Sequence, residues 1–273
     1  SMSVISAATK RHRRRPRHAP TRRRRCPISR AFRWKTSLET TSRHRRFVVA
    51  FRAFDDGVAF RYELPEQPDL RDFEIVDERT EFTFASNARA WWIPSNKPRL
   101  DRSEFLYAAS PLSTLDSIQT PVTFELPDGH TAVVIHEADL VDYPRMFLAG
   151  HGMENNSLRA ALAPMADGVK ARGRTPFVTP WRTIQLASSV KELAPSLLGL
   201  KLNPPSAISN TSWIKPMKYV GIWWGMHMNI WTWSSGPKHG ATTENTKRYI
   251  DFAAKNGFGG VLVEGWNVGW DGD

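Results

Sequence analysis

Aromatic side chains are concentrated in the stretch Lys218–Trp233, which reads KYVGIWWGMHMNIWTW. Its candidate ligand-binding residues are Trp223, His227, Trp231 and Trp233. A hydrophobic core rarely needs so many indoles, because each indole N–H must find a hydrogen-bond partner when it is buried. Accessible indole faces suit sugars, whose C–H faces pack on aromatic rings. The alternative is that these tryptophans only seal a junction between two domains.

A second group of polar and aromatic residues follows the apolar run GGVLV further along the chain. It consists of Glu264, Trp266 and Asn267. A carboxylate and an amide supply the hydrogen-bonding groups that sugar hydroxyls require. If both runs are neighbouring parallel strands, the two groups lie at the same carboxyl-terminal rim, where α/β barrels build their sites. The spacing therefore predicts a sugar-binding rim.

A third candidate is the carboxylate of Glu137 in the run AVVIHEADL. Strand alternation places Val133, Ile135 and Glu137 on one face, so the carboxylate continues an apolar stripe. A charge in such a place needs a partner, because burying it alone is costly. Pairing with Arg145 is one interpretation. His136 lies on the opposite face and is expected to be structural.

The elements that must position these residues change type along the chain. Over 47–202, short runs rich in β-branched and aromatic residues are separated by turn signals, without sustained helical periodicity. One pair of runs predicts a hairpin that turns at Pro127-Asp128-Gly129. The pattern is typical of an antiparallel β-sandwich, so we expect a mainly β fold in this part of the chain.

The carboxyl-terminal part shows a different pattern. Residues 203–216 are rich in proline, serine and asparagine and predict a linker. Over 217–273, an expected strand at Tyr219–Trp224 precedes an amphipathic helix with Thr243 as its N-cap and a stop at Asn256-Gly257. The run GGVLV then predicts a parallel strand that is buried on both faces. Together these elements predict the first β-α-β unit of a (β/α)8 barrel.

The formal net charge of +11 is concentrated near the amino terminus. Residues 1–46 contain sixteen Lys and Arg and one acid, whereas acids outnumber bases in the remainder. Residues 1–46 also contain few apolar side chains, which predicts a disordered arginine-rich tail. The net negative charge of the remaining residues disfavours nucleic-acid binding. No apolar run that would make a secretory signal or a membrane span is expected. The single cysteine, Cys26, excludes an intrachain disulfide.

Five motifs make the chain resemble glycoside hydrolase family 97. They are RAWWIPSN, VIHEADLVDYPRMFL, TPWRTIQLASSV, LNPPSAISNTSWIKPMKYVGIWWGMH and GVLVEGWNVGW. The resemblance implies an amino-terminal β-sandwich of the supersandwich type, a (β/α)8 catalytic barrel and a bound calcium ion. It also implies exo-acting hydrolysis of α-glucosides or α-galactosides, with an α-linked oligosaccharide as the bound partner.

By this resemblance, Glu137 is a calcium ligand, Glu264 faces the sugar or helps to order the metal site, and His227 occupies a substrate-pocket position. The family's catalytic carboxyl groups lie on later barrel strands, so we expect none of them in this chain and an inactive, truncated barrel start. Family members are exported, which implies a periplasmic or secreted protein although no signal peptide is recognisable. The alternatives are a carbohydrate-binding module without turnover and, less favoured, a nucleic-acid-associated protein that acts through the basic tail.

Overall fold

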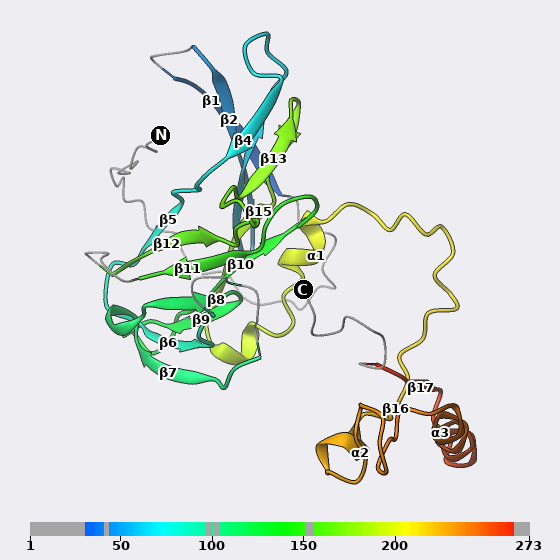
Figure 1. Ribbon diagram of the computed structural model, residues 1–273. Coiled ribbons are helices and arrows are strands. Elements are labelled where there is room, and N and C mark those ends of the chain that lie inside the picture. The colour runs from blue at the N-terminus through cyan, green and yellow to red at the C-terminus, as the bar shows by residue number, and fades with distance from the viewer. Residues whose placement is uncertain (1–30, 41–43, 97–99, 101–103, 151–155, 265–273) are drawn as a thin grey trace. The chain divides into compact units, whose positions relative to one another are not determined.

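Alternating apolar residues between Arg46 and Ala187 form antiparallel strands in the computed structural model (Figure 1). The structure describes residues 31–40, 44–96, 100, 104–150 and 156–264. The chain divides into two units, Ser1–Pro205 and Ser206–Asp273, which are considered separately below.

The larger sheet of the first unit has nine strands within the described residues, in the order β1-β2-β3-β15-β10-β9-β6-β7, with β14 paired to β3. Its strands are β1 (Phe32–Glu39), β2 (Arg46–Phe54), β3 (Gly57–Leu64), β6 (Arg89–Trp92), β7 (Ala108–Pro111), β9 (Val122–Glu125), β10 (Ala132–Ala138), β14 (Phe177–Val178) and β15 (Trp181–Ala187). Neighbouring strands are antiparallel.

The smaller sheet has four strands among the described residues, in the order β5-β12-β11-β8. They are β5 (Glu81–Thr83), β8 (Ser117–Gln119), β11 (Met146–Ala149) and β12 (Ser157–Leu162). A separate ribbon pairs β4 (Asp72–Ile75) with β13 (Ala171–Arg174). Short helical turns complete the unit at η1 (Leu112–Thr114), η2 (Val190–Glu192) and α1 (Leu198–Leu202).

The main core lies between the two sheets, because its buried residues come from strands of both. Phe124 and Ile135 belong to the larger sheet, and Leu148 and Leu158 belong to the smaller one. Strand β12 alternates strictly between buried and half-buried positions, as period-2 geometry requires. The predicted antiparallel β-sandwich is therefore confirmed.

The predicted hairpin is also present. Strands β9 and β10 pair antiparallel, and the Asp128 carboxylate accepts hydrogen bonds from the backbone N–H groups of His130 and Thr131, both at 2.8 Å. Gly129 adopts φ +68°, a left-handed conformation that glycine reaches without steric cost. The turn chemistry read from the sequence thus sets the register of the strand that carries Glu137.

The prediction that residues 1–46 are a disordered tail is wrong for its last part. Strand β1 pairs with β2 over eight residues, and Figure 1 shows the two as adjacent blue ribbons. The Trp34 ring stacks on Phe51 with centroids 4.7 Å apart, and Lys35 Nζ lies 2.5 Å from Glu63 Oε2. A strand of mixed composition is stable here because β2 supplies its hydrogen bonds and its aromatic partner. Residues 1–30 lie outside the described part.

The second unit contains β16 (Tyr219–Gly221), α2 (Trp224–His227), α3 (Thr243–Lys255) and β17 (Gly260–Leu262). Strands β16 and β17 pair in parallel, which confirms the predicted β-α-β connection. The first strand is shorter than expected, because α2 begins at Trp224. Between Leu202 and Tyr219 the structure, which describes all of these residues, has no helix or strand.

The boundaries of α3 differ slightly from the expectation. Its N-cap is Thr242 and not the predicted Thr243. The Thr242 hydroxyl accepts a hydrogen bond from the Asn245 N–H at 3.2 Å. Glu244 lies in the first turn, where a carboxylate complements the helix dipole. The predicted stop is confirmed, since Asn256 is the C-cap and Gly257 follows with φ +71°.

Candidate functional site

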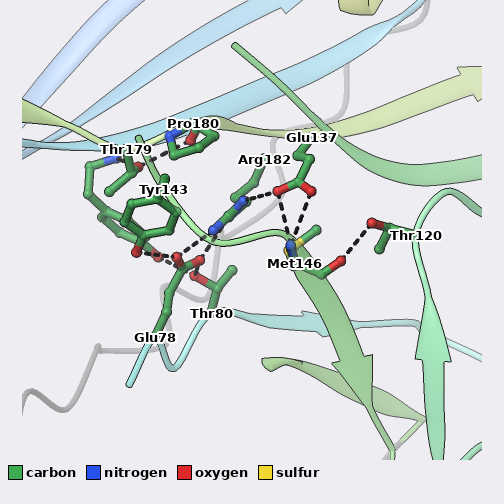
Figure 2. A network of polar contacts seen from close by, with 10 residues as sticks. Glu78, Thr80, Thr120, Glu137, Tyr143, Met146, Thr179, Pro180 and Arg182 are labelled. Carbon is green, nitrogen blue, oxygen red and sulfur yellow. Dashed lines mark hydrogen bonds and ion pairs between the residues drawn. The ribbon is translucent and has the colours of Figure 1, made fainter. Parts of the chain in front are cut away.

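A buried arginine joins two carboxylates inside the sandwich (Figure 2). The Arg182 side chain is 0% exposed, and its Nε and Nη2 atoms donate to Glu78 Oε1 and Oε2 at 2.9 and 2.6 Å. Its Nη1 atom donates to Glu137 Oε2 at 2.7 Å. Bidentate and charge-assisted hydrogen bonds of this kind are the strongest that side chains make in proteins. We call Glu78, Arg182 and Glu137 the buried triad.

Strand register explains why Glu137 meets Arg182. In the β10–β15 ladder Glu137 is directly opposite Arg182, and Val133, Ile135 and Glu137 all face the interior, as alternation predicts. Arg182 is therefore the ion-pair partner of Glu137 in the structure, in place of the Arg145 pairing suggested by the sequence. The Glu137 charge is therefore paired with an arginine on the neighbouring strand.

The Glu78 carboxylate accepts hydrogen bonds from two further side chains besides Arg182. Thr80 Oγ1 donates to Glu78 Oε1 at 2.8 Å and Tyr143 Oη donates to Glu78 Oε2 at 3.0 Å (Figure 2). Burial by itself would raise the pKa of Glu78, but the charge of Arg182 and these hydrogen bonds outweigh it and lower the pKa. Glu78 is therefore ionised, and its oxygens are occupied by protein donors.

Glu137 has a different electrostatic environment. Burial raises its pKa above the ordinary value, even though Arg182 and the backbone N–H of Met146, 3.1 Å from Oε1, favour the ionised form. The triad thus combines two carboxylates with one guanidinium. Glu137 has the weaker set of hydrogen-bond donors, so its ionised form is less favoured than that of Glu78. Proton uptake by Glu137 or a cation beside it would offset the cost of burying its charge.

An open hollow of about 860 Å³ adjoins this end of β10. Its lining includes Thr120, His136, Glu137, Arg145 and Asn203. Among the described residues His136 Nδ1 is buried without a hydrogen-bond partner, and burial followed by the nearby Arg145 charge lowers the pKa of His136. A neutral imidazole, an arginine and the edge of a carboxylate thus surround a space large enough for a small ligand.

The residues around Glu137 do not by themselves match a calcium site. Calcium takes six to eight oxygen ligands, usually from several carboxylates and carbonyls. Among the described residues no group of three or more His, Cys, Asp or Glu side chains could hold a metal ion. Glu137 Oε2 also lies 2.7 Å from the positively charged Arg182. Glu137 therefore contributes at most one ligand, and the calcium assignment stays a prediction.

In the second unit the structure brings two of the predicted sugar-binding residues together. The rings of Trp223 and His227 meet edge to face with centroids 4.6 Å apart. His227 and Trp233 are exposed, and Glu264 is half-buried just after β17. Trp266 and Asn267 lie outside the described residues. Exposed or partly exposed aromatic faces therefore remain in the described segment that follows β16.

Trp231 has a packing role instead of an open face. Its ring meets Tyr249 on α3 edge to face at 5.9 Å, and it lies against two glycines. A Cβ atom at Gly225 would come 2.7 Å from Trp231 Cε3, and one at Gly240 would clash with the Trp231 side chain. For this tryptophan the structure favours a packing role within the second unit.

We therefore expect Gly225→Ala to loosen the second unit. The added methyl group must displace the Trp231 ring, and overpacking of this kind costs about 1–3 kcal/mol. Hydrogen–deuterium exchange over residues 224–240 should accelerate. The matched control is Gly199→Ala, because a Cβ there meets nothing within 4 Å. Unchanged exchange in the Gly225 variant would show that Trp231 is not packed as described.

Sequence reasoning missed three residues of this site, Glu78, Tyr143 and Arg182. A signal was nevertheless present, because Arg182 interrupts the run WRTIQLA much as Glu137 interrupts AVVIHEA. Two opposite charges, each inside an apolar strand, are expected to pair with one another when the strands are neighbours. The sequence did not show that β10 and β15 are neighbours, so the match was not apparent.

Comparison with known proteins decides the family. The family model described as "Glycosyl-hydrolase 97 N-terminal" matches residues 17–205, and the one described as "Glycoside hydrolase 97" matches residues 223–273. The chain belongs to glycoside hydrolase family 97. The first match covers the sandwich with the buried triad and reaches into the arginine-rich segment. The second covers α2, α3 and β17 of the second unit.

Two curated proteins are similar in sequence, and a solved family 97 structure has the same fold over the shared part. A "Retaining alpha-galactosidase" from Bacteroides thetaiotaomicron is 29% identical over 82% of this chain, and a "Probable retaining alpha-galactosidase" from Streptomyces bingchenggensis is 28% identical over 81%. A family 97 enzyme from Pseudoalteromonas sp., solved with acarbose, is 43% identical with a TM-score of 0.74 over 90% of this chain. The same enzyme in a variant form was solved with panose.

This chain spans only part of each family 97 relative. It covers 37% and 32% of the two curated relatives and 40% of the Pseudoalteromonas enzyme. No described helix is long and apolar enough to cross a membrane.

Proposed function

We propose that this chain forms the sandwich domain and the first barrel strands of an exo-acting α-glycosidase. The observation that carries the proposal is the pair of family matches, which cover the sandwich and the β-α-β unit in that order. The substrate class is an α-linked oligosaccharide with a terminal glucose or galactose. The relatives named as α-galactosidases support galactose as the terminal sugar. The relative solved with acarbose and panose supports glucose.

In this proposal the second unit contributes part of the sugar pocket. Trp223 and Trp233 supply aromatic faces, Glu264 accepts hydrogen bonds from sugar hydroxyls, and His227 orients Trp223 by the ring contact described above. The sequence places Trp266 and Asn267 after the same strand as Glu264, so they are proposed as further sugar-binding residues. Trp231 is assigned to the packing of the unit.

The catalytic pair is proposed to come from outside this chain. Glycoside hydrolysis needs two carboxyl groups on either side of the scissile bond, one to protonate the leaving oxygen and one to attack or to activate water. Glu78 and Glu137 are the paired carboxylates of the sandwich, but both bind Arg182 and the Glu78 side chain is only 6% exposed. Neither arrangement suits proton donation to a substrate.

The role of Glu137 is proposed to be at the hollow, where it orders a cation or a substrate group. The family resemblance favours calcium, which would draw its remaining oxygen ligands from residues outside this chain. Bound calcium would supply a fixed positive charge beside this carboxylate. What this chain does is hold the Glu137 carboxylate at the end of β10 through Arg182 and Met146. A periplasmic or extracellular location fits a substrate of this class.

The test compares two proteins on the same substrates. A protein extended to the length of the relatives is expected to hydrolyse 4-nitrophenyl α-glucoside or α-galactoside, and the 273-residue chain is expected to hydrolyse neither. The preferred substrate identifies the terminal sugar. If the extended protein is folded but inactive on both substrates, the proposed function is wrong. If the short chain is active, the catalytic pair lies within it and our placement of that pair is wrong.

A further inference from the structure

Basic side chains gather on the outer face of the larger sheet, at its β1–β2–β3 end. They are Arg33, Lys35, Arg52 and Arg61. Two of these side chains form ion pairs with nearby acids. Lys35 Nζ lies 2.5 Å from Glu63 Oε2, and Arg61 Nη2 lies 2.9 Å from Glu63 Oε1. Arg61 Nη1 is also 3.8 Å from Asp139 Oδ2.

The other two arginines form an uncompensated like-charge pair. Arg33 and Arg52 are directly opposite each other in the β1–β2 ladder, where side chains are nearest neighbours and like charges destabilise the pairing. In the part of the chain that the structure describes, neither guanidinium has a hydrogen bond or an ion pair. Burial, and then the charges of Arg33 and Arg61, lower the pKa of Arg52 even though Asp139 and Glu63 act in the opposite direction.

A buried indole holds two of these guanidinium groups in place. Arg52 Cζ lies 4.4 Å and Arg61 Cζ 4.5 Å from the centroid of the Trp181 ring. Trp181 is only 2% exposed, and among the described residues its Nε1 atom is buried without a hydrogen-bond partner. Stacking on a rigid aromatic ring restricts both side chains before any ligand arrives, which lowers the entropic cost of binding.

We propose that Arg33 and Arg52 form a binding site for an oxyanion on the outer face of the sandwich. The ligand chemistry is a phosphate or sulfate group, or the carboxylate of an acidic sugar. Guanidinium groups match such oxygens with parallel N–H donors, and an anion between Arg33 and Arg52 removes their mutual repulsion. The site lies on the sheet face opposite to the Glu78–Arg182–Glu137 triad, so it does not depend on the proposed hydrolytic function.

The test is a titration of the complete 273-residue chain with inorganic phosphate, sulfate, glucuronate and glucose at constant ionic strength. Binding is followed by NMR of the arginine Nε–H and tryptophan indole groups. The charged probes are expected to shift the signals of Arg52 and Trp181, and glucose is not. Arg33→Gln combined with Arg52→Gln should weaken the affinity about tenfold for each arginine removed, since hydrogen bonds to charged groups are worth about that much.

The matched control is Arg89→Gln. Arg89 also lies over an indole, 4.7 Å from the Trp91 ring, but it is opposite Glu125 in its ladder and thus has a neighbouring acid. This variant should bind the anions like the parent. If the double variant does not fold, Arg33→Gln alone is used, because Arg33 is exposed and outside the core.

The four probes separate the possible ligands. Tighter binding of phosphate and sulfate than of glucuronate identifies a tetrahedral anion, and the reverse order identifies an acidic sugar. Equal affinity of the parent and the Arg33 and Arg52 variants for every anion would overturn the proposal. So would shifts confined to other arginines, or anion binding that the Arg89 control loses to the same extent.

Discussion

Arg182→Leu is expected to destabilise the sandwich by about 3–5 kcal/mol, because the change leaves two buried carboxylates without their shared partner. Glu78 and Glu137 would have to be buried as charges or take up protons, and both alternatives weaken the folded state at neutral pH. Chemical denaturation of the 273-residue chain, followed by far-ultraviolet circular dichroism, measures the loss.

Two further variants separate the charge from the shape of the side chain. Arg174→Leu is the control, because Arg174 forms an exposed pair with Asp72 that is worth about 1 kcal/mol or less. Replacing the whole triad by Glu78→Gln, Glu137→Gln and Arg182→Met should recover much of the lost stability, since no unpaired charge remains. A single Arg182→Leu variant as stable as Arg174→Leu would show that the buried triad does not stabilise the sandwich.

The pH dependence of stability should differ between parent and variant. In the parent, the lowered pKa of Glu78 gives stability that is present above its unfolded pKa and is lost as pH falls through the folded pKa. The raised pKa of Glu137 acts oppositely, because the folded state holds that proton more tightly. Without Arg182 both carboxylates prefer to be protonated, so acidification from neutral pH should stabilise the variant.

Glu137→Gln is expected to lower turnover of the extended enzyme by about 100-fold, the scale of loss that misplaced groups produce at active sites. The change conserves shape but removes the charge that faces the hollow. Its matched control is Glu78→Gln. This change also weakens the hydrogen bonding of Arg182, but Glu78 does not line the hollow. The Glu78 variant should lose at least as much stability as the Glu137 variant, because Glu78 has the stronger hydrogen bonds and the lowered pKa. Only the Glu137 variant should lose most of its activity.

Calcium titration distinguishes the possible roles of Glu137 in that experiment. If Glu137 orders a cation, added calcium should partly restore the activity of the Glu137 variant, and direct calcium binding should weaken. If it orders substrate, calcium has no effect and KM rises. Equal activity of the Glu137 and Glu78 variants would leave Glu137 as a structural partner of Arg182 only.

Local patterns in the sequence determined the type of each element. Short runs of β-branched and aromatic residues between turn signals predicted the sandwich strands. Asp128-Gly129 predicted the hairpin before β10, and Asn256-Gly257 predicted the end of α3. These features depend on residues within a few positions of one another, so they can be read without the fold. The same local reasoning placed Glu137 on the buried face of its strand.

Only the tertiary structure decided which residues meet. Arg182 is 45 positions from Glu137 and 104 from Glu78, so their contacts exist only through the pairing of β10 with β15 and the packing of the two sheets. Strand β1 was assigned to a disordered tail for the same reason, since its stability comes from Phe51 and Glu63 on other strands. Contacts between distant residues depend on strand order, and strand order is a property of the whole sheet that no short segment encodes.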